Sequence, residues 1–320
     1  MYVVAVAGGL GNLGRLITDA VFENGKHEVY VISRKASFSH VPEDFPTRIS
    51  PLTGKEYLPI IQTNYSSESE MARLLEKHNI HTVICTLAIG FQAACGSQIA
   101  LVRASEQAST VKRFIPSEFN LDYDLGDDVL PFPDKCLEFT YIYPGMFMDY
   151  FGMPHVSTHL RELYIVIDPT NGVAYVPGDG EAKLAMSYAK DVVKYTALAL
   201  DLEKWPRVMT TASCAMTLNQ IVALTEKNLG RKLKVTYQQI PALLKHDSKT
   251  LPGNIVVTDK YPGGLEKIMA LTADLECSIG LGAYDFDKLS EHLNLVDHFV
   301  GKTEPPKKIE DVLEMAWKGR

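Results

Sequence analysis

The stretch Val3-Val4-Ala5-Val6-Ala7-Gly8-Gly9-Leu10-Gly11-Asn12-Leu13-Gly14 joins an apolar run to glycines at G-x-x-G-x-x-G spacing. The run predicts a buried β-strand, and the amphipathic residues 13–22 predict a helix after it. Glycine suits the tight turn between them, where a dinucleotide pyrophosphate must approach bare backbone at a helix N-terminus. The predicted cofactor-binding residues are Gly8, Gly9, Leu10, Gly11, Asn12, Leu13 and Gly14. The alternative is a purely structural strand-to-helix turn.

A second apolar run, residues 29–32, ends in Ser33-Arg34-Lys35. Arg34 lies 20 residues after Gly14, where an NAD enzyme usually carries an acidic residue for the ribose 2′-hydroxyl. A cation there, with Lys35 beside it, suits a 2′-phosphate instead. The sequence therefore predicts NADP as the cofactor, with an ordinary solvated charge at Arg34 as the alternative.

Apolar runs alternate with helical patterns through the first half of the chain. Strands are expected at 60–64, 82–87, 113–116 and 139–143, and a loop at 40–59. Helices are expected at 98–109 and at 66–78, the latter with Ser66 or Ser67 as its cap and Glu70 as capping-box partner. This order predicts an α/β fold with a Rossmann-type doubly wound parallel sheet. Ligands bind at the carboxyl ends of such strands, which adds Thr86 and Leu87 to the predicted cofactor site.

The second half is less regular. We expect two short strands within 174–186 about a turn at 177–180, a helix running to Leu202 and capped by Asp191, and a strand at 233–237. Further helices are expected at 218–229 and 309–317. The predicted domains are an NADP-binding Rossmann domain over 1–150 and a smaller substrate-binding lobe over 151–320, interleaved with the core.

Composition limits the classes of function. The 320 residues are 46% hydrophobic and 22% charged, and the net charge of −7 without a Lys/Arg run excludes nucleic acid bound by bulk electrostatics. No apolar run approaches the ~20 residues that span a membrane. Five scattered cysteines lack zinc spacing, and no basic region of a signal peptide precedes the first strand. We expect a cytoplasmic protein with reduced thiols.

Residues 111–119, Val-Lys-Arg-Phe-Ile-Pro-Ser-Glu-Phe, together with the glycine turn and Arg34, resemble the isoflavone reductase-like branch of the NmrA-type oxidoreductases. Residues 178–180 and 191–193 fit the same family, and 141–152 resemble its fungal members. The resemblance implies an atypical short-chain dehydrogenase that uses NADPH to reduce a phenolic or polyketide-like metabolite, often in secondary metabolism. The family also includes redox-sensing regulators that bind NADP without turnover. The partner is then a small-molecule substrate, with a possible homodimer, or a regulatory protein.

Residues 117–138 depart from the family pattern. A parallel crossover usually includes a helix, but this stretch carries five aspartates, Pro131 and Pro133 and no helical apolar periodicity. In the family, that helix carries the lysine proposed as general acid/base. Lys135 is the nearest remaining lysine and the candidate catalytic residue, with a solvated loop lysine as the alternative. Because the crossover is shortened, a third interpretation is that the chain is degenerate and folds poorly.

Aromatic and methionine side chains gather at 141–153, from the end of the last strand of the predicted sheet onward. With Phe119, we expect Phe147, Met148 and Phe151 to line an apolar substrate pocket, with core packing as the alternative.

Two other pairs have suggestive spacing. Tyr284 and Lys288 have the tyrosine–lysine spacing of short-chain dehydrogenases, but they lie far from the predicted cofactor strands, so coincidence is the alternative. His155 and His159 could share a helix face, but no carboxylate or cysteine directly beside them completes a site, so we expect no metal.

Overall fold

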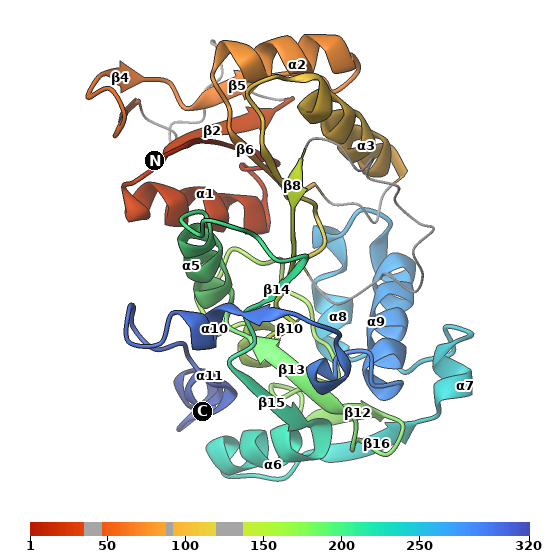
Figure 1. Ribbon diagram of the computed structural model, residues 1–320. Helices are drawn as coiled ribbons and strands as arrows, with labels where there is room; N and C mark the ends of the chain where they lie inside the picture. Colours follow the sequence, from red (N-terminus) through yellow and green to blue (C-terminus); the bar gives the residue numbers. More distant parts are fainter. Residues whose placement is uncertain (35–46, 88–91, 120–136) are drawn as a thin grey trace. The chain divides into compact units, whose positions relative to one another are not determined.

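The computed structural model describes residues 1–34, 47–87, 92–119 and 137–320, which divide into two compact units (Figure 1). Among these residues, the first unit holds those up to 119 together with 137–142 and 193–209. The second unit holds 143–192 and 210–320. Each unit is made of more than one stretch of the chain, so the two units are interleaved in sequence.

The first unit is built on a six-stranded parallel sheet. Its strand order is β5-β2-β1-β6-β7-β8, and every neighbouring pair is parallel. The strands are β1 (Val3–Ala7), β2 (Glu28–Ser33), β5 (Ile60–Gln62), β6 (Thr82–Cys85), β7 (Arg113–Ile115) and β8 (Glu138–Phe139). Because the strand order reverses at β1, its carboxyl end lies at the switch point where ligands of open α/β sheets bind.

Helices cover both faces of this sheet. Helix α1 (Asn12–Asn24) lies on one face, and α2 (Glu68–Lys77) and α3 (Gln92–Gln107) lie on the other (Figure 1). All five residues of β1 are buried, as a strand between two helical layers requires. The Ser67 hydroxyl accepts a hydrogen bond from the Glu70 N–H (3.2 Å) and caps α2, as expected. The Rossmann-type α/β fold is confirmed.

Some boundaries differ from those expected. The strand predicted at 139–143 is two strands, because Thr140 interrupts it: β8 belongs to the parallel sheet, and β9 (Tyr141–Tyr143) to another. The region 40–59 is not all loop, since β3 (Arg48–Ile49) and β4 (Glu56–Tyr57) form a small antiparallel hairpin. Residues 40–46 of that region lie outside the described residues.

The remaining strands form three-stranded sheets. Their orders are β10-β13-β15, β11-β12-β16 and β17-β14-β9. The two strands expected within 174–186 exist but belong to different sheets, so they do not form a hairpin. The strands are β10 (Met146–Phe147), β11 (Ile167–Asp168), β12 (Val173–Pro177), β13 (Lys183–Ser187), β14 (Val208–Thr210), β15 (Cys214–Thr217), β16 (Lys234–Gln238) and β17 (Leu293–Asn294).

Helices α6 (Leu218–Leu229) and α11 (Ile309–Trp317) have the predicted bounds. Asp191 does not cap its helix, because α5 already begins at Ala189 and ends at Ala199; its carboxylate instead accepts the Lys307 N–H (2.8 Å). The others are α4 (Asp149–Gly152), α7 (Ile240–Leu243), α8 (Pro252–Val256), α9 (Gly264–Gly280), α10 (Leu295–His298) and the 3₁₀ turns η1 (Thr258–Lys260) and η2 (Phe286–Lys288). None of the helices described reaches the length and apolarity that a membrane span needs.

Side chains close the amino edge of the parallel sheet. His27, Tyr2 and His81 directly precede β2, β1 and β6, and the Tyr2 ring stacks on both imidazoles, with ring centroids 5.8 and 4.1 Å away. Arg113, the first residue of β7, donates from Nε to Glu138 Oε2 (2.7 Å) and lies over the Trp205 ring (4.8 Å). This amino-edge stack of the first unit ties four adjacent strands together.

Candidate functional site

The glycine turn begins where β1 ends. Gly8 has φ +79°, in the left-handed region that favours glycine, and its N–H donates to the Ile32 carbonyl at the end of β2 (3.3 Å). The Gly11 N–H then donates back to the Gly8 carbonyl (2.8 Å), and α1 starts at Asn12. The strand, turn and helix therefore follow one another as the sequence predicts.

Close packing explains why Gly14 has no side chain. A Cβ atom at Gly14 would overlap the Gly8 carbonyl and lie 2.5 Å from Thr86 Oγ1. The Thr86 hydroxyl cannot easily withdraw, because it donates to the Ala7 carbonyl (2.7 Å), which also accepts the Thr86 N–H (2.9 Å). The first turn of α1 is thus held against the ends of β1 and β6, and its backbone stays bare.

The N-terminus of α1 retains its positive character. Its cap residue is Gly11, which makes no side-chain capping bond, and its first turn contains no acidic residue. The first N–H groups of a helix lack intrahelical acceptors, and the helix dipole favours an anion there. Bare backbone at a positive helix end is an arrangement that a pyrophosphate fits.

Arg34 follows β2 directly, at the same carboxyl edge as the glycine turn. Its side chain is exposed. Burial raises the pKa of the nearby Tyr65 phenol, and the positive charge of Arg34 offsets part of that rise. Arg34, which is predicted to bind the 2′-phosphate, therefore lies at the end of the strand next to the glycine turn. Lys35, the second predicted cation, lies outside the described residues.

The ends of β6 and β7 complete this edge. The Ser117 hydroxyl donates to the Leu87 carbonyl (2.7 Å), and the Ser117 N–H donates to Gln98 Oε1 on α3 (2.9 Å). Thr86 and Leu87 are both half-buried. Burial raises the pKa of the neighbouring Cys85 thiol to about 12, so this cysteine remains an unreactive thiol.

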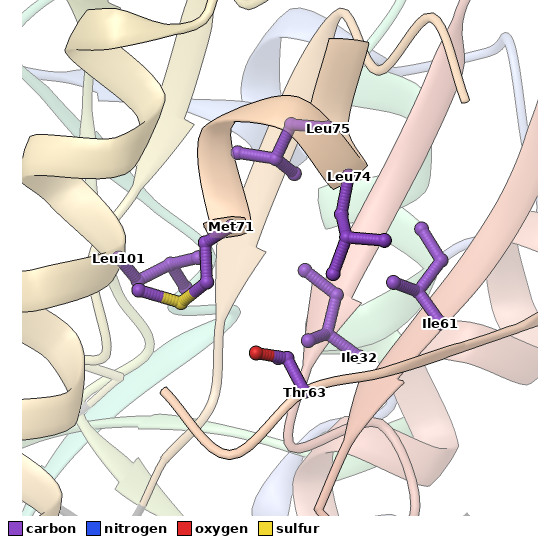
Figure 2. Close-up of a pocket in the computed structure, with 7 residues that line it drawn as sticks. All are labelled: Ile32, Ile61, Thr63, Met71, Leu74, Leu75 and Leu101. Carbon is purple, nitrogen blue, oxygen red and sulfur yellow. The ribbon is translucent and has the colours of Figure 1, made fainter. Parts of the chain in front are cut away.

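A small apolar cavity lies beside this edge, under α2 and α3. Figure 2 shows its seven lining side chains: Ile32, Ile61, Thr63, Met71, Leu74, Leu75 and Leu101. Its volume of about 10 Å³ is room for about one water molecule. As it stands, the cavity does not admit an aromatic ring.

The candidate substrate residues have different surroundings. Phe119, in the first unit, is 9% exposed, whereas Met148 and Phe151, in the second, are fully buried in its hydrophobic core. Core packing, the alternative interpretation, describes Met148 and Phe151. Phe147 is half-buried, with its ring edge-on to Tyr150 at 6.5 Å between centroids, and it keeps the surface that a ligand contact needs.

The candidate proton donors are Lys135 and the pair formed by Tyr284 and Lys288. Lys135 lies outside the described residues. Tyr284 is buried, whereas Lys288 is exposed and paired with Asp285 (3.3 Å), so the two do not form a tyrosine–lysine pair.

The histidine pair shows no sign of a metal site. His155 and His159 are both exposed, and His155 Nδ1 contacts a guanidinium nitrogen of Arg320 (2.6 Å). Among the residues that the structure covers, no group of three metal-ligating side chains occurs.

Two polar residues of this edge were not found by sequence reasoning. Thr18 donates from its hydroxyl to the Gly14 carbonyl (2.8 Å), and the Tyr65 hydroxyl donates to the Ile32 carbonyl (3.1 Å). The mostly polar residues 63–67 indicate a turn, but they do not predict which group the Tyr65 hydroxyl contacts. Thr18 lies one helical turn beyond Gly14 in α1. Tyr65 is separated from Ile32 by 33 positions in the sequence.

Comparison with known proteins agrees with this arrangement. The NmrA-like family profile matches residues 2–259. The chain is 29% identical over 295 residues to Oxidoreductase swnN of Metarhizium robertsii, covering 80% of this chain and 82% of the relative. It is 30% identical over 244 residues to Oxidoreductase BOA1 of Botryotinia fuckeliana, covering 72% and 77%.

A solved structure shares the fold. The binary complex of leucoanthocyanidin reductase with NADPH from Vitis vinifera matches with a TM-score of 0.70 and 18% identity, covering 97% of this chain and 98% of that one. The profile match extends over most of the chain, including the glycine turn and segments of both units. The chain therefore belongs to the NmrA-like family.

Proposed function

We propose that this protein is an NADPH-dependent oxidoreductase that reduces a small phenolic or polyketide-like metabolite. The observation that carries the proposal is the glycine turn, whose bare backbone meets an uncapped helix N-terminus beside Arg34. The relatives named as oxidoreductases and the reductase solved with NADPH support the same activity.

Each residue of the edge has a role in this proposal. The turn from Gly8 to Gly14 binds the pyrophosphate through the N–H groups at the start of α1, and Arg34 with Lys35 binds the 2′-phosphate. Thr86 and Leu87 border the turn from β6. Bound NADPH supplies a hydride, and the protein supplies orientation and a proton. Lys135 is the proposed proton donor, and Phe119 and Phe147 are the proposed aromatic contacts of the substrate.

The second candidate function is an NADP-binding regulator without turnover. It is favoured by the sequence of 117–138, which stands where the family has its catalytic helix. This stretch contains prolines and has no helical periodicity, so its sequence does not favour such a helix. Both functions require NADPH binding, but only the reductase requires consumption of NADPH.

Two measurements test these functions in order. A fluorescence titration should show saturable NADPH binding, and its absence would exclude both. Loss of NADPH absorbance should then be followed with a panel of phenolic, quinone and polyketide-like carbonyl compounds. We expect oxidation that depends on one of them; binding without oxidation across the panel would favour the regulator.

Lys135→Ala should keep NADPH binding and lose turnover, and full turnover would remove Lys135 as the proton donor.

A further inference from the structure

Tyr65 has an unfavourable backbone conformation at the carboxyl edge of the sheet. It follows β5 closely and has φ +60°, in the left-handed region that residues with a Cβ atom rarely adopt. Its own N–H donates to Thr63 Oγ1 (3.3 Å), which closes a short turn. Such strain persists where the surrounding structure fixes it, and it is often found near functional sites.

The Tyr65 side chain explains why the conformation is kept. The residue is only 6% exposed, and it belongs to the core of the first unit that also contains Ile32 and Ile61. Its hydroxyl donates to the Ile32 carbonyl (3.1 Å). The left-handed turn thus directs a bulky side chain back beneath the end of β2.

The Ile32 carbonyl is the link to the glycine turn. It accepts two hydrogen bonds, one from the Tyr65 hydroxyl and one from the Gly8 N–H (3.3 Å). The next carbonyl, that of Ser33, accepts the Thr63 N–H (3.2 Å). The 63–65 turn therefore holds both of the last two carbonyls of β2, immediately before Arg34.

We propose that Tyr65 is a positioning residue that fixes the glycine turn and Arg34 relative to each other through the Ile32 carbonyl. This inference rests on the proposed NADPH binding. The buried hydroxyl acts through the backbone of β2 and does not contact the cofactor. A dinucleotide with a 2′-phosphate uses both the turn and Arg34, whereas NADH uses only the turn, so Tyr65 contributes to the preference for NADPH.

Tyr65→Phe removes the hydroxyl and keeps the ring. We expect the Kd for NADPH to rise about fivefold, which corresponds to the ~1 kcal/mol that one hydrogen bond contributes. The Kd for NADH should rise less than about twofold, on the same scale. In turnover, KM for NADPH should rise while kcat at saturating cofactor stays unchanged.

Tyr57→Phe is the matched control. The Tyr57 hydroxyl also donates to a carbonyl of β2, that of Val29 (3.1 Å), but at the opposite end of the strand. Because the Tyr57 hydroxyl also accepts the Val29 N–H (3.1 Å), this variant should lose at least as much thermal stability as Tyr65→Phe and should keep both dissociation constants. Equal changes in NADPH affinity for the two variants would overturn the positioning role.

A double-mutant cycle separates this inference from the proposed function. If wild-type protein binds no NADPH, the proposed function fails. If wild-type protein binds NADPH, Tyr65→Phe should lower the selectivity for NADPH over NADH only while Arg34 is present. An equal selectivity loss in the Arg34→Ala background, or none in the wild-type background, would contradict the role of Tyr65. Thermal unfolding of each variant shows whether it is folded.

Discussion

The two edges of the parallel sheet in the first unit are built in opposite ways. At the amino edge, His27, Tyr2, His81 and Arg113 fill the ends of four adjacent strands with stacked rings and a buried guanidinium. At the carboxyl edge, β1 leads into glycines whose missing side chains leave the turn backbone and the first N–H groups of α1 uncovered by side chains. The difference separates stability from binding: side chains hold the strands at one edge, so the other can present its backbone to a ligand.

The largest effect is expected from breaking the bare edge at Gly14. In Gly14→Ala, the added Cβ would overlap the Gly8 carbonyl, whose hydrogen bond to the Gly11 N–H shapes the turn. We expect the Kd for NADPH to rise by about 100-fold, or about 2.8 kcal/mol, measured by fluorescence titration.

Gly96→Ala is the control for that substitution. Gly96 lies in α3 with open space where its Cβ would be, so alanine there should stabilise the protein by about 0.5–1 kcal/mol. NADPH affinity should not change. Equal binding by the Gly14 and Gly96 variants would mean that the turn tolerates a side chain.

At the amino edge we expect the opposite result: a substitution should lower the stability of the protein and leave NADPH binding unchanged. Arg113→Met removes the ion pair with Glu138 and the bond to the Glu203 carbonyl (2.7 Å), both made by a guanidinium that is almost fully buried. We expect the free energy of unfolding to fall by about 3 kcal/mol in urea titrations, while the Kd for NADPH stays unchanged in the folded protein. Arg103→Met, which removes an exposed pair with Glu68, should cost less than about 1 kcal/mol. A large loss of NADPH affinity in Arg113→Met would show that the two edges are not independent.

A smaller, pH-dependent effect is expected at the same edge. Burial, with Arg113 and Lys112 nearby, lowers the pKa of His81 to about 4, and burial also lowers that of His27. Because unfolded histidine has a pKa near 6.5, the unfolded state binds more protons as the pH falls from about 6.5 to 4. Stability should therefore be complete above about pH 6.5 and should decline by about 1–2 kcal/mol below it. Urea midpoints between pH 7.5 and 5 measure this decline, and His81→Gln should reduce it; an unchanged slope would exclude His81 as a source.

Sequence patterns predicted much of this fold because its strands and helices have clear periodicity. The turn at 8–14, the capping of α2 by Ser67 and the bounds of α6 and α11 depend on neighbouring residues only. The interruption at Thr140 was not predicted, because threonine and its aromatic and β-branched neighbours all favour strands, and only pairing with different strands divides β8 from β9.

The candidate site was predictable only in part. Gly8 to Gly14 and Arg34 follow a pattern along the chain, so their positions at the carboxyl edge could be expected. The Tyr65 hydroxyl meets the Ile32 carbonyl across 33 residues of sequence, and no local pattern encodes such a contact. Met148 was expected in a pocket but is buried, because a run of apolar residues has the same sequence signature in a cleft and in a core.

The central claim is that the carboxyl edge of this sheet binds a dinucleotide with a 2′-phosphate. The most direct test compares NADPH and NADH binding in wild-type protein and in Arg34→Asp, by the same fluorescence titration. We predict that the substitution raises the Kd for NADPH by about 50-fold or more and the Kd for NADH by less than about threefold. Equal losses for both cofactors, or no loss for either, would contradict the assignment of Arg34 and with it the choice of NADP.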